Sequence, residues 1–371
     1  MTLATAAVGM FRVGQHALSV DESISLRVAR QPLFAAGRIV AETDAALPSP
    51  YELLLHVWQF GGTSETFLRS LSVTLGVGTV LVLFALNVRL FDRRTAVASC
   101  TLLIVNLSFI RHMQEVTAYA LVLFLAVTAS WCFALALTRP SSSRWITYAV
   151  ISAAAMWSYV ASGFVVFAHA ISLLLRRPRP SLGRIGASCL LAGALVTLLV
   201  FLMRGTERFG GPLASPPSEP AFERLLLYLM VGGGMPGSGT YLLSLMYFAI
   251  CCAGFIMVAR AENRHRHSAG SWANSLILLW IGIPVVAAFC MSIARPTLDP
   301  RSLIVVLPAV VTIAGIGISS LPHRTLRGLA IAIVVALSSG PIFSYYRIPI
   351  GDGGDGRTVA AYVAQHALRQ P

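Results

Sequence analysis

Long apolar runs, separated by short segments that carry arginine, follow one another along most of the chain. A helix needs about 20 apolar residues to cross a hydrocarbon core about 30 Å thick, and most of the runs approach that length. The runs cover residues 68–88, 95–110, 116–138, 146–175, 185–203, 240–259, 273–294, 302–321 and 327–346. This pattern predicts an all-α polytopic membrane protein.

The run at 146–175 is longer than one span requires. Its 30 residues would measure about 45 Å as a single helix. Ser158, Ser162 and Gly163 interrupt it near the middle, so we predict two short helices joined by a tight outer turn. A single helix would also carry the arginine cluster at 176–184 to the outer side, against the usual bias of basic residues toward the inside.

The N-terminal segment is the shortest candidate span. Only residues 1–11 lack charge, so either Arg12 and His16 extend to the outer interface or the span begins upstream, and we favour a truncated first span. The count then reaches about 11 spans, with the N-terminus inside and the C-terminus outside. We therefore predict a transmembrane domain at 1–347 and a short extracytoplasmic tail at 348–371.

The first outer loop, residues 21–67, contains two segments with helical character. The segments at 23–42 and 50–60 mix arginine or aromatic residues with aliphatic ones, and the second begins with Pro50 at a favoured first-turn position. We predict that both are helices lying in the membrane interface rather than crossing it.

The composition agrees with a membrane protein and excludes other classes. Hydrophobic residues make up 56% of the chain and charged residues 12%, whereas soluble domains carry about 25% charged residues. The net charge of +13 comes from arginine alone, because the sequence has no lysine. These arginines lie in short clusters between apolar runs, so no nucleic-acid partner is predicted. Arginine in place of lysine, with abundant alanine and valine, indicates a GC-rich bacterial genome. We predict a multi-pass protein of the inner (plasma) membrane whose active site faces outside.

Neither the cysteines nor the histidines form a recognisable ligand set. The six cysteines fall inside apolar runs without metal-ligand spacing. His265 and His267 lie in an inner arginine cluster without a cysteine or a pair of acids beside them. We therefore predict no metal site and no cofactor. His169 lies in the middle of a span, and we interpret it as a packed, hydrogen-bonded core side chain.

Two adjacent acids, Asp21 and Glu22, stand where the first apolar stretch meets water. The chain has only 15 acidic residues in 371. A carboxylate costs about 2.5–3.5 kcal/mol at the centre of a membrane helix, so acids at a membrane edge point to a functional site or to an interface. The pair is the first candidate for chemistry at the outer face.

Several segments, in this order and spacing, resemble the GT-C membrane glycosyltransferases, which include protein O-mannosyltransferases and the aminoarabinose and galacturonic acid lipid A transferases. They are SVDESIS, TDAALPSPYELLLHVWQFGGTSETFLRSLS, RLFDRRTA, SFIRHMQEVTAYALVL and RPTLDPRSLIVVLP. The resemblance extends from about residue 12 to DGRTVAAYV near the end. It implies transfer of a sugar from a polyprenyl-phosphate donor to an acceptor hydroxyl at the outer membrane face, with inversion.

The resemblance also implies residue roles. Asp21 would be the general base that removes the acceptor proton, and Glu22 would hold the acceptor or the sugar. An inverting displacement needs one carboxylate within reach of the nucleophile, and a leaving lipid phosphate needs no general acid. Arg69 and Arg301 match motif arginines and would contact the leaving phosphate through their planar guanidinium groups. Arg111 and Arg295 are further candidates at the same depth.

Three other polar residues complete the predicted site. Glu115 and Tyr119 are four residues apart, so we expect them on one face of the fourth helix, as contacts for the sugar or the acceptor. Asp44 is a less typical substrate-binding candidate, because AALPSP follows it where the family often has a Pro-Pro-Leu pattern. Some relatives use a divalent ion, but this sequence does not show ligands for one.

The leading hypothesis is therefore a glycosyltransferase, with mannose as one candidate sugar and an envelope glycan, lipid or protein as acceptor, surrounded by membrane lipids. The alternative is a transporter or flippase of lipid-linked sugars, which would place ionisable residues near the membrane midplane. In this chain the acids concentrate at one face, which favours the enzyme. Retention of Asp21, Glu22 and both motif arginines argues against a non-catalytic scaffold.

Overall fold

The structure, a computed structural model, describes residues 1–31, 49–175, 219–231, 238–264, 269–294 and 300–347, with isolated positions at 183, 186, 193, 362 and 365. Every regular element in these ranges is a helix, which confirms the all-α prediction. The α-helices are α1 (Thr2–Met10), α2 (Val20–Ala29), α4 (Pro50–Trp58), α5 (Glu65–Leu90), α6 (Arg93–Ile104), α7 (Leu107–Gln114), α8 (Tyr119–Thr138), α9 (Ser142–Ser158), α10 (Ser162–Leu175), α12 (Glu219–Val231), α13 (Ser238–Arg264), α14 (Ala269–Ala294), α15 (Leu307–Ser319) and α16 (Arg324–Arg347), and two 3-10 helices are η1 (Gln59–Gly61) and η2 (Pro300–Val306).

Five helices, α5, α8, α13, α14 and α16, are long and apolar enough to cross a membrane. The pair α6–α7 adds a sixth if its two bent halves count as one span. Helices α10 and α15 are apolar but have only 14 and 13 residues. The predicted count of about 11 spans is therefore not confirmed within the described ranges, and the expected span at 185–203 lies almost wholly outside them.

The long apolar run at 146–175 is divided into two helices, as its sequence predicts. Helix α9 ends at Ser158, and the chain is extended at Tyr159, with φ −161° and ψ 120°. Helix α10 then begins at Ser162. The Ser158 hydroxyl donates to the carbonyl of Ala154, one turn back, which is a common use of serine near a helix end. The polar interruption in the run therefore marks the break correctly.

The run at 95–110 is also divided, which its apolar pattern does not reveal. Helices α6 and α7 meet at an angle of 62°. Asn106 begins α7, because its side-chain oxygen accepts a hydrogen bond from the amide of Phe109 at 3.3 Å. Its amide nitrogen donates to the carbonyl oxygens of Leu229 and Met230 at the end of α12, at 3.0 and 3.3 Å. Asn106 thus starts one helix and caps another.

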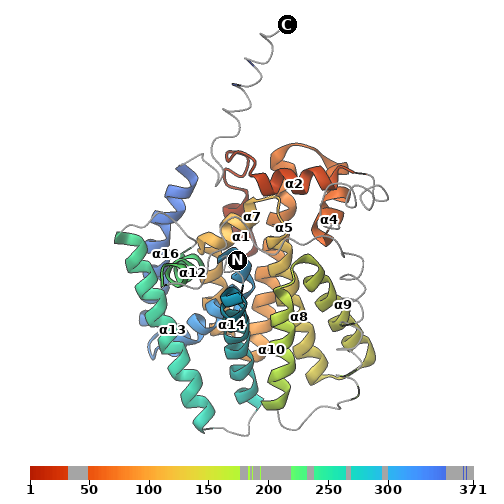
Figure 1. Cartoon of the computed structure of the whole chain (residues 1–371). Coiled ribbons are helices and arrows are strands. Elements are labelled where there is room, and N and C mark those ends of the chain that lie inside the picture. The colour runs from red at the N-terminus through yellow and green to blue at the C-terminus, as the bar shows by residue number, and fades with distance from the viewer. Residues whose placement is uncertain are drawn as a thin grey trace.

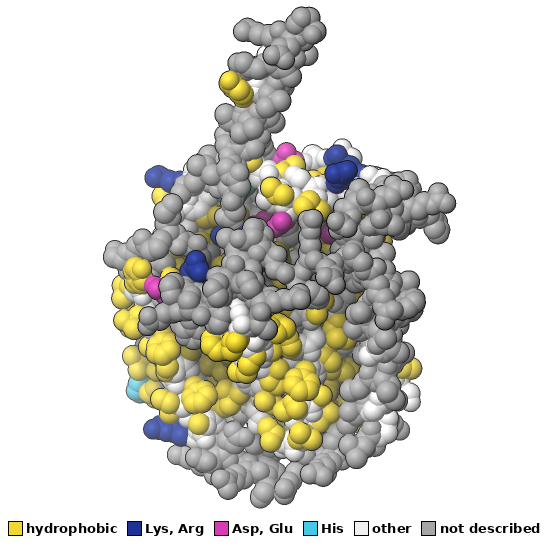
Figure 2. Space-filling view, viewed as in Figure 1, with side chains coloured by type: hydrophobic (Ala, Val, Ile, Leu, Met, Phe, Trp, Pro, Cys, Tyr) yellow, Lys and Arg dark blue, Asp and Glu magenta, His cyan; other side chains and the backbone are white. Residues whose placement is uncertain are grey.

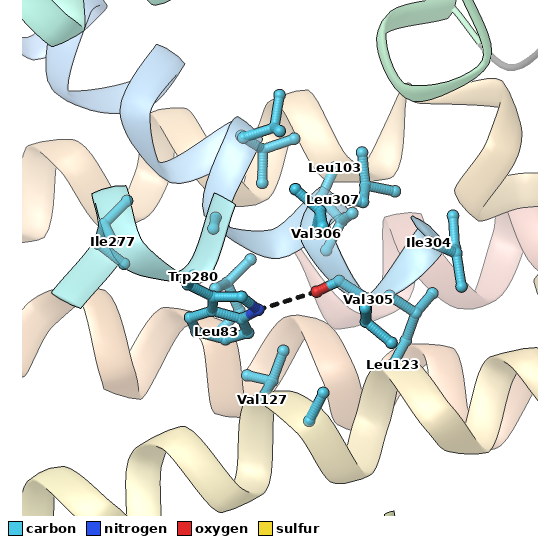
Figure 3. Packing of buried hydrophobic residues seen from close by; sticks show 14 of the residues in the cluster. Leu83, Leu103, Leu123, Val127, Ile277, Trp280, Ile304, Val305, Val306 and Leu307 are labelled. Atoms are coloured by element: carbon cyan, nitrogen blue, oxygen red, sulfur yellow. Dashed lines mark hydrogen bonds between the residues drawn. The ribbon is translucent and has the colours of Figure 1, made fainter. Parts of the chain in front are cut away.

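The largest buried cluster joins the central helices to η2. Trp280 of α14 is fully buried, and its indole N–H donates to the carbonyl oxygen of Val305 at 2.9 Å. Figure 3 shows this bond with Leu83, Leu123 and Val127 packed around it. The bond satisfies a main-chain oxygen inside the apolar core, where an unsatisfied one would be costly. The core therefore fixes the position of η2.

His169 is a structural core residue, as predicted. Its Nε2 lies 3.0 Å from the Ser130 hydroxyl and its Nδ1 lies 3.1 Å from the Tyr148 hydroxyl. Its ring also stacks on Phe133, with the ring centroids 4.6 Å apart. Both ring nitrogens have partners, which is the usual condition of a buried histidine.

Helices α13 and α15 cross closely at glycine. A Cβ atom on Gly317 would collide with the main-chain oxygen of Ile250, and one on Gly254 would collide with that of Ile313. Small residues at such a crossing allow two membrane helices to approach, and close packing then supplies their attraction. This contact holds α15, and with it the end of η2, against the bundle.

Polar and apolar surfaces lie at different parts of the bundle. Figure 1 shows α2 across one end, close to the N-terminal part of α5. In the same view, Figure 2 shows acidic side chains at that end and hydrophobic side chains over the flank below. Large apolar side chains such as Phe248, Phe255 and Phe343 are exposed on α13 and α16, as expected for helices in contact with lipid. The helix expected at 50–60 is present as α4 with η1, whereas the one expected at 23–42 corresponds only in part to α2, which ends at Ala29; residues 32–48 lie outside the described ranges.

Candidate active site

The site begins at the first turn of α2, where a capping box fixes the chain. The Ser19 hydroxyl accepts a hydrogen bond from the Glu22 amide at 3.2 Å, and Glu22 Oε2 accepts one from the Ser19 amide at 2.9 Å. This reciprocal pair satisfies two donors at the start of the helix. Asp21, between them, keeps half of its side chain exposed. The cap therefore turns one acid inward and leaves the other at the surface.

Glu22 is buried and has four hydrogen-bond donors around its carboxylate. Besides the Ser19 amide, it accepts from Arg69 Nε at 2.9 Å, from Arg69 Nη2 at 3.0 Å and from the Val116 amide at 3.0 Å. Only 1% of the residue is exposed. A carboxylate has about four lone-pair positions, so these donors occupy it fully.

Arg69 is equally enclosed, with 1% exposed. Its Nη1 donates to the carbonyl oxygens of Val13 at 2.7 Å and His16 at 3.0 Å, and its Nη2 donates to that of Ala17 at 3.5 Å. Together with the two bonds to Glu22, these contacts engage all of its nitrogens. Every polar side-chain atom of Glu22 and Arg69 is therefore engaged within the protein.

Asp21 meets Arg301, so two predicted site residues from opposite ends of the chain come together. Arg301 Nη1 lies 3.2 Å from Asp21 Oδ2, across 280 residues of sequence. Arg301 stands in η2, which the core contact of Val305 holds in place. The Arg301 side chain is 18% exposed and that of Asp21 50% exposed. The pair is therefore accessible at the end of the bundle, unlike Glu22 and Arg69.

A second carboxylate lies at the end of α7. Glu115 is the C-cap residue, with φ −105° and ψ 143°, and its side chain is 26% exposed. Its Oε2 lies 3.2 Å from His112 Nδ1. On the other side of the same imidazole, His112 Nε2 lies 2.5 Å from the hydroxyl of Tyr228 in α12. Three side chains from α7, its C-cap and α12 thus form one chain of hydrogen bonds.

The pKa of Glu115 is lowered from its ordinary value. Burial opposes ionisation, but the hydrogen bond from His112 and the positive charges of Arg111 and Arg301 favour the ionised form, and the pKa is lowered on balance. Glu115 is therefore an ionised acceptor at neutral pH. Arg111, another predicted site residue, stands in the last turn of α7 and is partly exposed.

Main-chain contacts connect Glu115 to the acidic pair on α2. The amide that donates to Glu22 belongs to Val116, the residue after Glu115. The carbonyl oxygen of Glu115 accepts a hydrogen bond from Ser72 of α5 at 2.7 Å. Both contacts hold the peptide group between Glu115 and Val116, and one of them is with Glu22, the neighbour of Asp21. The two exposed carboxylates belong to one region.

The expected arrangement of Glu115 and Tyr119 on one helix face is wrong. The chain is extended at Glu115, and Tyr119 is the first residue of the next helix, α8. The two residues approach through His112 instead, because the Tyr119 ring lies 4.6 Å from the His112 ring, centroid to centroid. The Tyr159 ring lies 6.0 Å from that of Tyr119. Aromatic rings therefore flank the imidazole that is hydrogen-bonded to the Glu115 carboxylate.

Sequence reasoning missed His112 and Tyr228. His112 lies in the last turn of α7, and Tyr228 is 116 residues further along the chain. No pattern in the sequence connects them. Two predicted site residues, Asp44 and Arg295, lie outside the described ranges. Among the residues that the structure does describe, no group of three His, Cys, Asp or Glu side chains could hold a metal ion.

Comparisons with known proteins agree on the kind of fold. The family model of dolichyl-phosphate-mannose-protein mannosyltransferases matches residues 53–203. A search of curated protein sequences finds no match. The fold resembles ArnT from Cupriavidus metallidurans, solved with undecaprenyl phosphate (TM-score 0.57, 18% identity, 93% of this chain and 67% of that one) and in the apo state (0.59, 18%, 93% and 66%). It also resembles the apo oligosaccharyltransferase of Archaeoglobus fulgidus (0.56, 13%, 100% and 58%).

The chain spans about two thirds of the length of the ArnT structures and a little more than half of the oligosaccharyltransferase. The fold is that of the GT-C membrane glycosyltransferases, and the family model with these structures indicates a glycosyltransferase of this type. The predicted resemblance is confirmed.

Proposed function

We propose that this protein transfers a sugar from a polyprenyl-phosphate donor to an acceptor hydroxyl, with inversion at the anomeric carbon and with Asp21 as general base. Mannose is the first sugar to test, because the matching family model is that of dolichyl-phosphate-mannose-protein mannosyltransferases. The lipid part of the donor is suggested by the ArnT structure, which is bound to undecaprenyl phosphate. The acceptor class is an envelope glycan, lipid or protein.

The observation that carries the proposal is the pair of Asp21 and Arg301. A half-exposed carboxylate stands 3.2 Å from a guanidinium at the end of the bundle. In the proposed step, Asp21 takes the proton of the acceptor hydroxyl while the acceptor oxygen forms a bond to the anomeric carbon. The bond from that carbon to the phosphate oxygen breaks, and the lipid phosphate leaves as an anion. Arg301 is suited to bind it, because a guanidinium donates two parallel hydrogen bonds to phosphate.

The remaining predicted residues divide into two groups in this proposal. Glu22 and Arg69 hold the chain that carries Asp21, because all of their polar atoms are engaged within the protein. Glu115 and Tyr119 bind sugar or acceptor hydroxyl groups, because an ionised carboxylate beside an aromatic ring matches the hydroxyls and the apolar face of a pyranose.

The arrangement of basic residues favours an outward-facing site. Helices α5 and α8 begin beside the site and end in arginine-bearing turns at 89–94 and 139–144. Helix α16 runs the other way, from Arg324 to Tyr346, whose carbonyl oxygen accepts a hydrogen bond from Arg12. The short basic turns therefore lie at the end opposite the site, and such turns usually face the cytoplasm. This arrangement supports the proposal that the site lies on the outer face of the inner membrane.

The proposal is tested by transfer assays with Asp21→Asn. The purified protein in lipid nanodiscs is supplied with radiolabelled undecaprenyl-phosphate mannose, and in parallel with glucose and galactose donors, together with an extract of envelope lipids and glycans. Loss of a general base lowers rates by about 10²-fold to 10⁴-fold, so we expect no measurable transfer by the variant.

Asp92→Asn is the matched control. Asp92 caps α6 through the amide of Thr95 at 2.6 Å, and asparagine caps a helix equally well. We expect normal transfer by this variant. Wild-type rates from a folded Asp21→Asn protein would refute the assignment of the base, and the absence of transfer by the parent protein from every polyprenyl-phosphate donor would refute the reaction class.

A further inference from the structure

We propose that His112 is a positioning residue that holds the Glu115 carboxylate toward the substrate while Tyr228 fixes the opposite edge of its imidazole. This inference rests on the proposed function, because it gives Glu115 a substrate to bind. It concerns a histidine and a tyrosine to which neither the sequence nor the comparisons assign a role.

The first support is the burial of the imidazole between two partners. The side chain of His112 is 3% exposed, whereas that of Glu115 is 26% exposed. Nδ1 lies 3.2 Å from Glu115 Oε2 and Nε2 lies 2.5 Å from the Tyr228 hydroxyl. The histidine thus lies inside the protein, and the carboxylate to which it is hydrogen-bonded is the more accessible of the two side chains.

The second support is the direction of the hydrogen bonds. An ionised carboxylate only accepts, so Nδ1–H must donate to Glu115. In a neutral imidazole Nε2 is then an acceptor, and the Tyr228 hydroxyl donates to it. This order, from tyrosine to histidine to carboxylate, fixes the tautomer and the plane of the ring. A histidine fixed at both nitrogens holds the carboxylate in one orientation.

The third support is that Tyr228 is itself fixed in the bundle. The main-chain oxygen of Tyr228 accepts a hydrogen bond from the buried Ser108 hydroxyl of α7. Asn106 donates to the carbonyl oxygens of the next two residues, Leu229 and Met230. Helix α12 is therefore attached to α7 at three consecutive carbonyl groups, and this attachment presents the tyrosine hydroxyl to the imidazole. Three hydrogen bonds therefore hold the helix that carries Tyr228.

The fourth support is electrostatic. The hydrogen bond from His112 is the largest of the influences that favour ionised Glu115, ahead of the fields of Arg111 and Arg301. Loss of His112 therefore raises the pKa of Glu115 and leaves its carboxylate less constrained. Other titratable groups that act in this region are His16, Tyr51, Tyr119, Tyr228 and Tyr345.

The test compares three substitutions of the histidine. His112→Asn keeps a donor close to the place of Nδ1, His112→Gln keeps a polar group close to the place of Nε2, and His112→Phe keeps only the ring volume. We expect the transfer rate to fall about 100-fold in the phenylalanine variant, as for a misplaced substrate contact. Asparagine is expected to restore much of the rate, and glutamine little of it.

Tyr228→Phe separates positioning from support of the fold. It removes one hydroxyl but leaves the bond from Nδ1 to Glu115, so we expect a much smaller loss of transfer than in His112→Phe. Tyr247→Phe is the matched control, because that tyrosine is also buried and its hydroxyl donates to a main-chain carbonyl, that of Leu102, at 3.3 Å. Equal losses in Asn, Gln and Phe variants, or a Tyr228→Phe loss as large as that of His112→Phe, would overturn the proposal.

A spectroscopic measurement keeps this test independent of the reaction. The infrared C=O band of protonated Glu115 is isolated by subtracting the spectrum of Glu115→Gln, and its intensity is followed as the pH is lowered. We expect the midpoint to lie higher in His112→Phe than in wild type and His112→Asn. An unchanged midpoint would refute the positioning role even if transfer were observed. A shifted midpoint in a protein that transfers no sugar would instead refute the proposed function alone.

Discussion

Removal of Arg69 should unfold the end of the bundle that carries Asp21. In Arg69→Met the aliphatic volume is retained, but Glu22 loses two of its four donors and remains a buried carboxylate. The carbonyl oxygens of Val13, His16 and Ala17 also lose their shared donor. Breaking a buried ion pair by removing one partner costs about 3–5 kcal/mol. With both residues 1% exposed, the estimate needs no large reduction for solvent screening.

The assay is reversible unfolding in mixed micelles, titrated with SDS and followed by circular dichroism, for Arg69→Met, Glu22→Gln and the double variant. Because the double variant leaves no buried charge, we expect it to be more stable than the sum of the single changes indicates, by about 1–3 kcal/mol. Additive effects of the two changes would contradict the reasoning. So would an Arg69→Met protein that unfolds as wild type does but has lost donor binding, since that result would restore Arg69 as a phosphate contact.

Three further predictions concern the site and the helix packing. Arg301→Gln should raise the KM for the lipid-phosphate donor about 10-fold to 100-fold, as expected for the loss of charged hydrogen bonds, and should change the KM for the acceptor little. Equal changes in the two KM values would refute the assignment of Arg301 to the phosphate. Gly317→Ala should destabilise the α13–α15 crossing by about 1–3 kcal/mol, whereas Gly282→Ala, with no atom within 4 Å of the new methyl group, should not. Since folding lowers the pKa of Glu115 from 4.5, its charge contributes stability above that pH and loses the contribution as pH falls through the folded pKa. Wild type should therefore lose stability on acidification in this range more steeply than Glu115→Gln, and parallel curves would refute this.

The sequence predicted the positions of helices correctly where the local pattern of residues is enough to determine them. The apolar runs gave the helical elements, and Ser158 and Ser162 marked a break because serine near a run's middle competes for the main chain. The bend at Asn106 was not predicted, because it depends partly on carbonyl groups of α12 that lie 123 and 124 residues away in the sequence. The predicted number of spans is not confirmed in the described part of the chain, for a related reason. Apolar character does not distinguish a full span from the shorter helices α10 and α15.

The site was predictable by location but not by role. Asp21 and Arg301 were expected at one end and are in contact there. Glu22 and Arg69 carry the same charges in the sequence, but only their three-dimensional surroundings show that every polar atom is engaged. His112 gave no signal, because its importance comes from its two partners rather than from its neighbours in the chain. The sequence pattern therefore predicts which charged side chains lie at one end of the bundle. The packing of the folded protein determines which of those side chains remain exposed there.

The bend between α6 and α7 also sets the depth of the Glu115 carboxylate. The eight residues of α7 cover about 12 Å along their own axis. Inclined by 62°, they advance only about 6 Å along the direction of α6. A straight continuation would carry the end of α7 about 6 Å further along that axis, which exceeds one helical turn. The bend at Asn106 thus shortens the reach of α7 along that axis by about half, and this sets how far the Glu115 carboxylate stands from the end of α6.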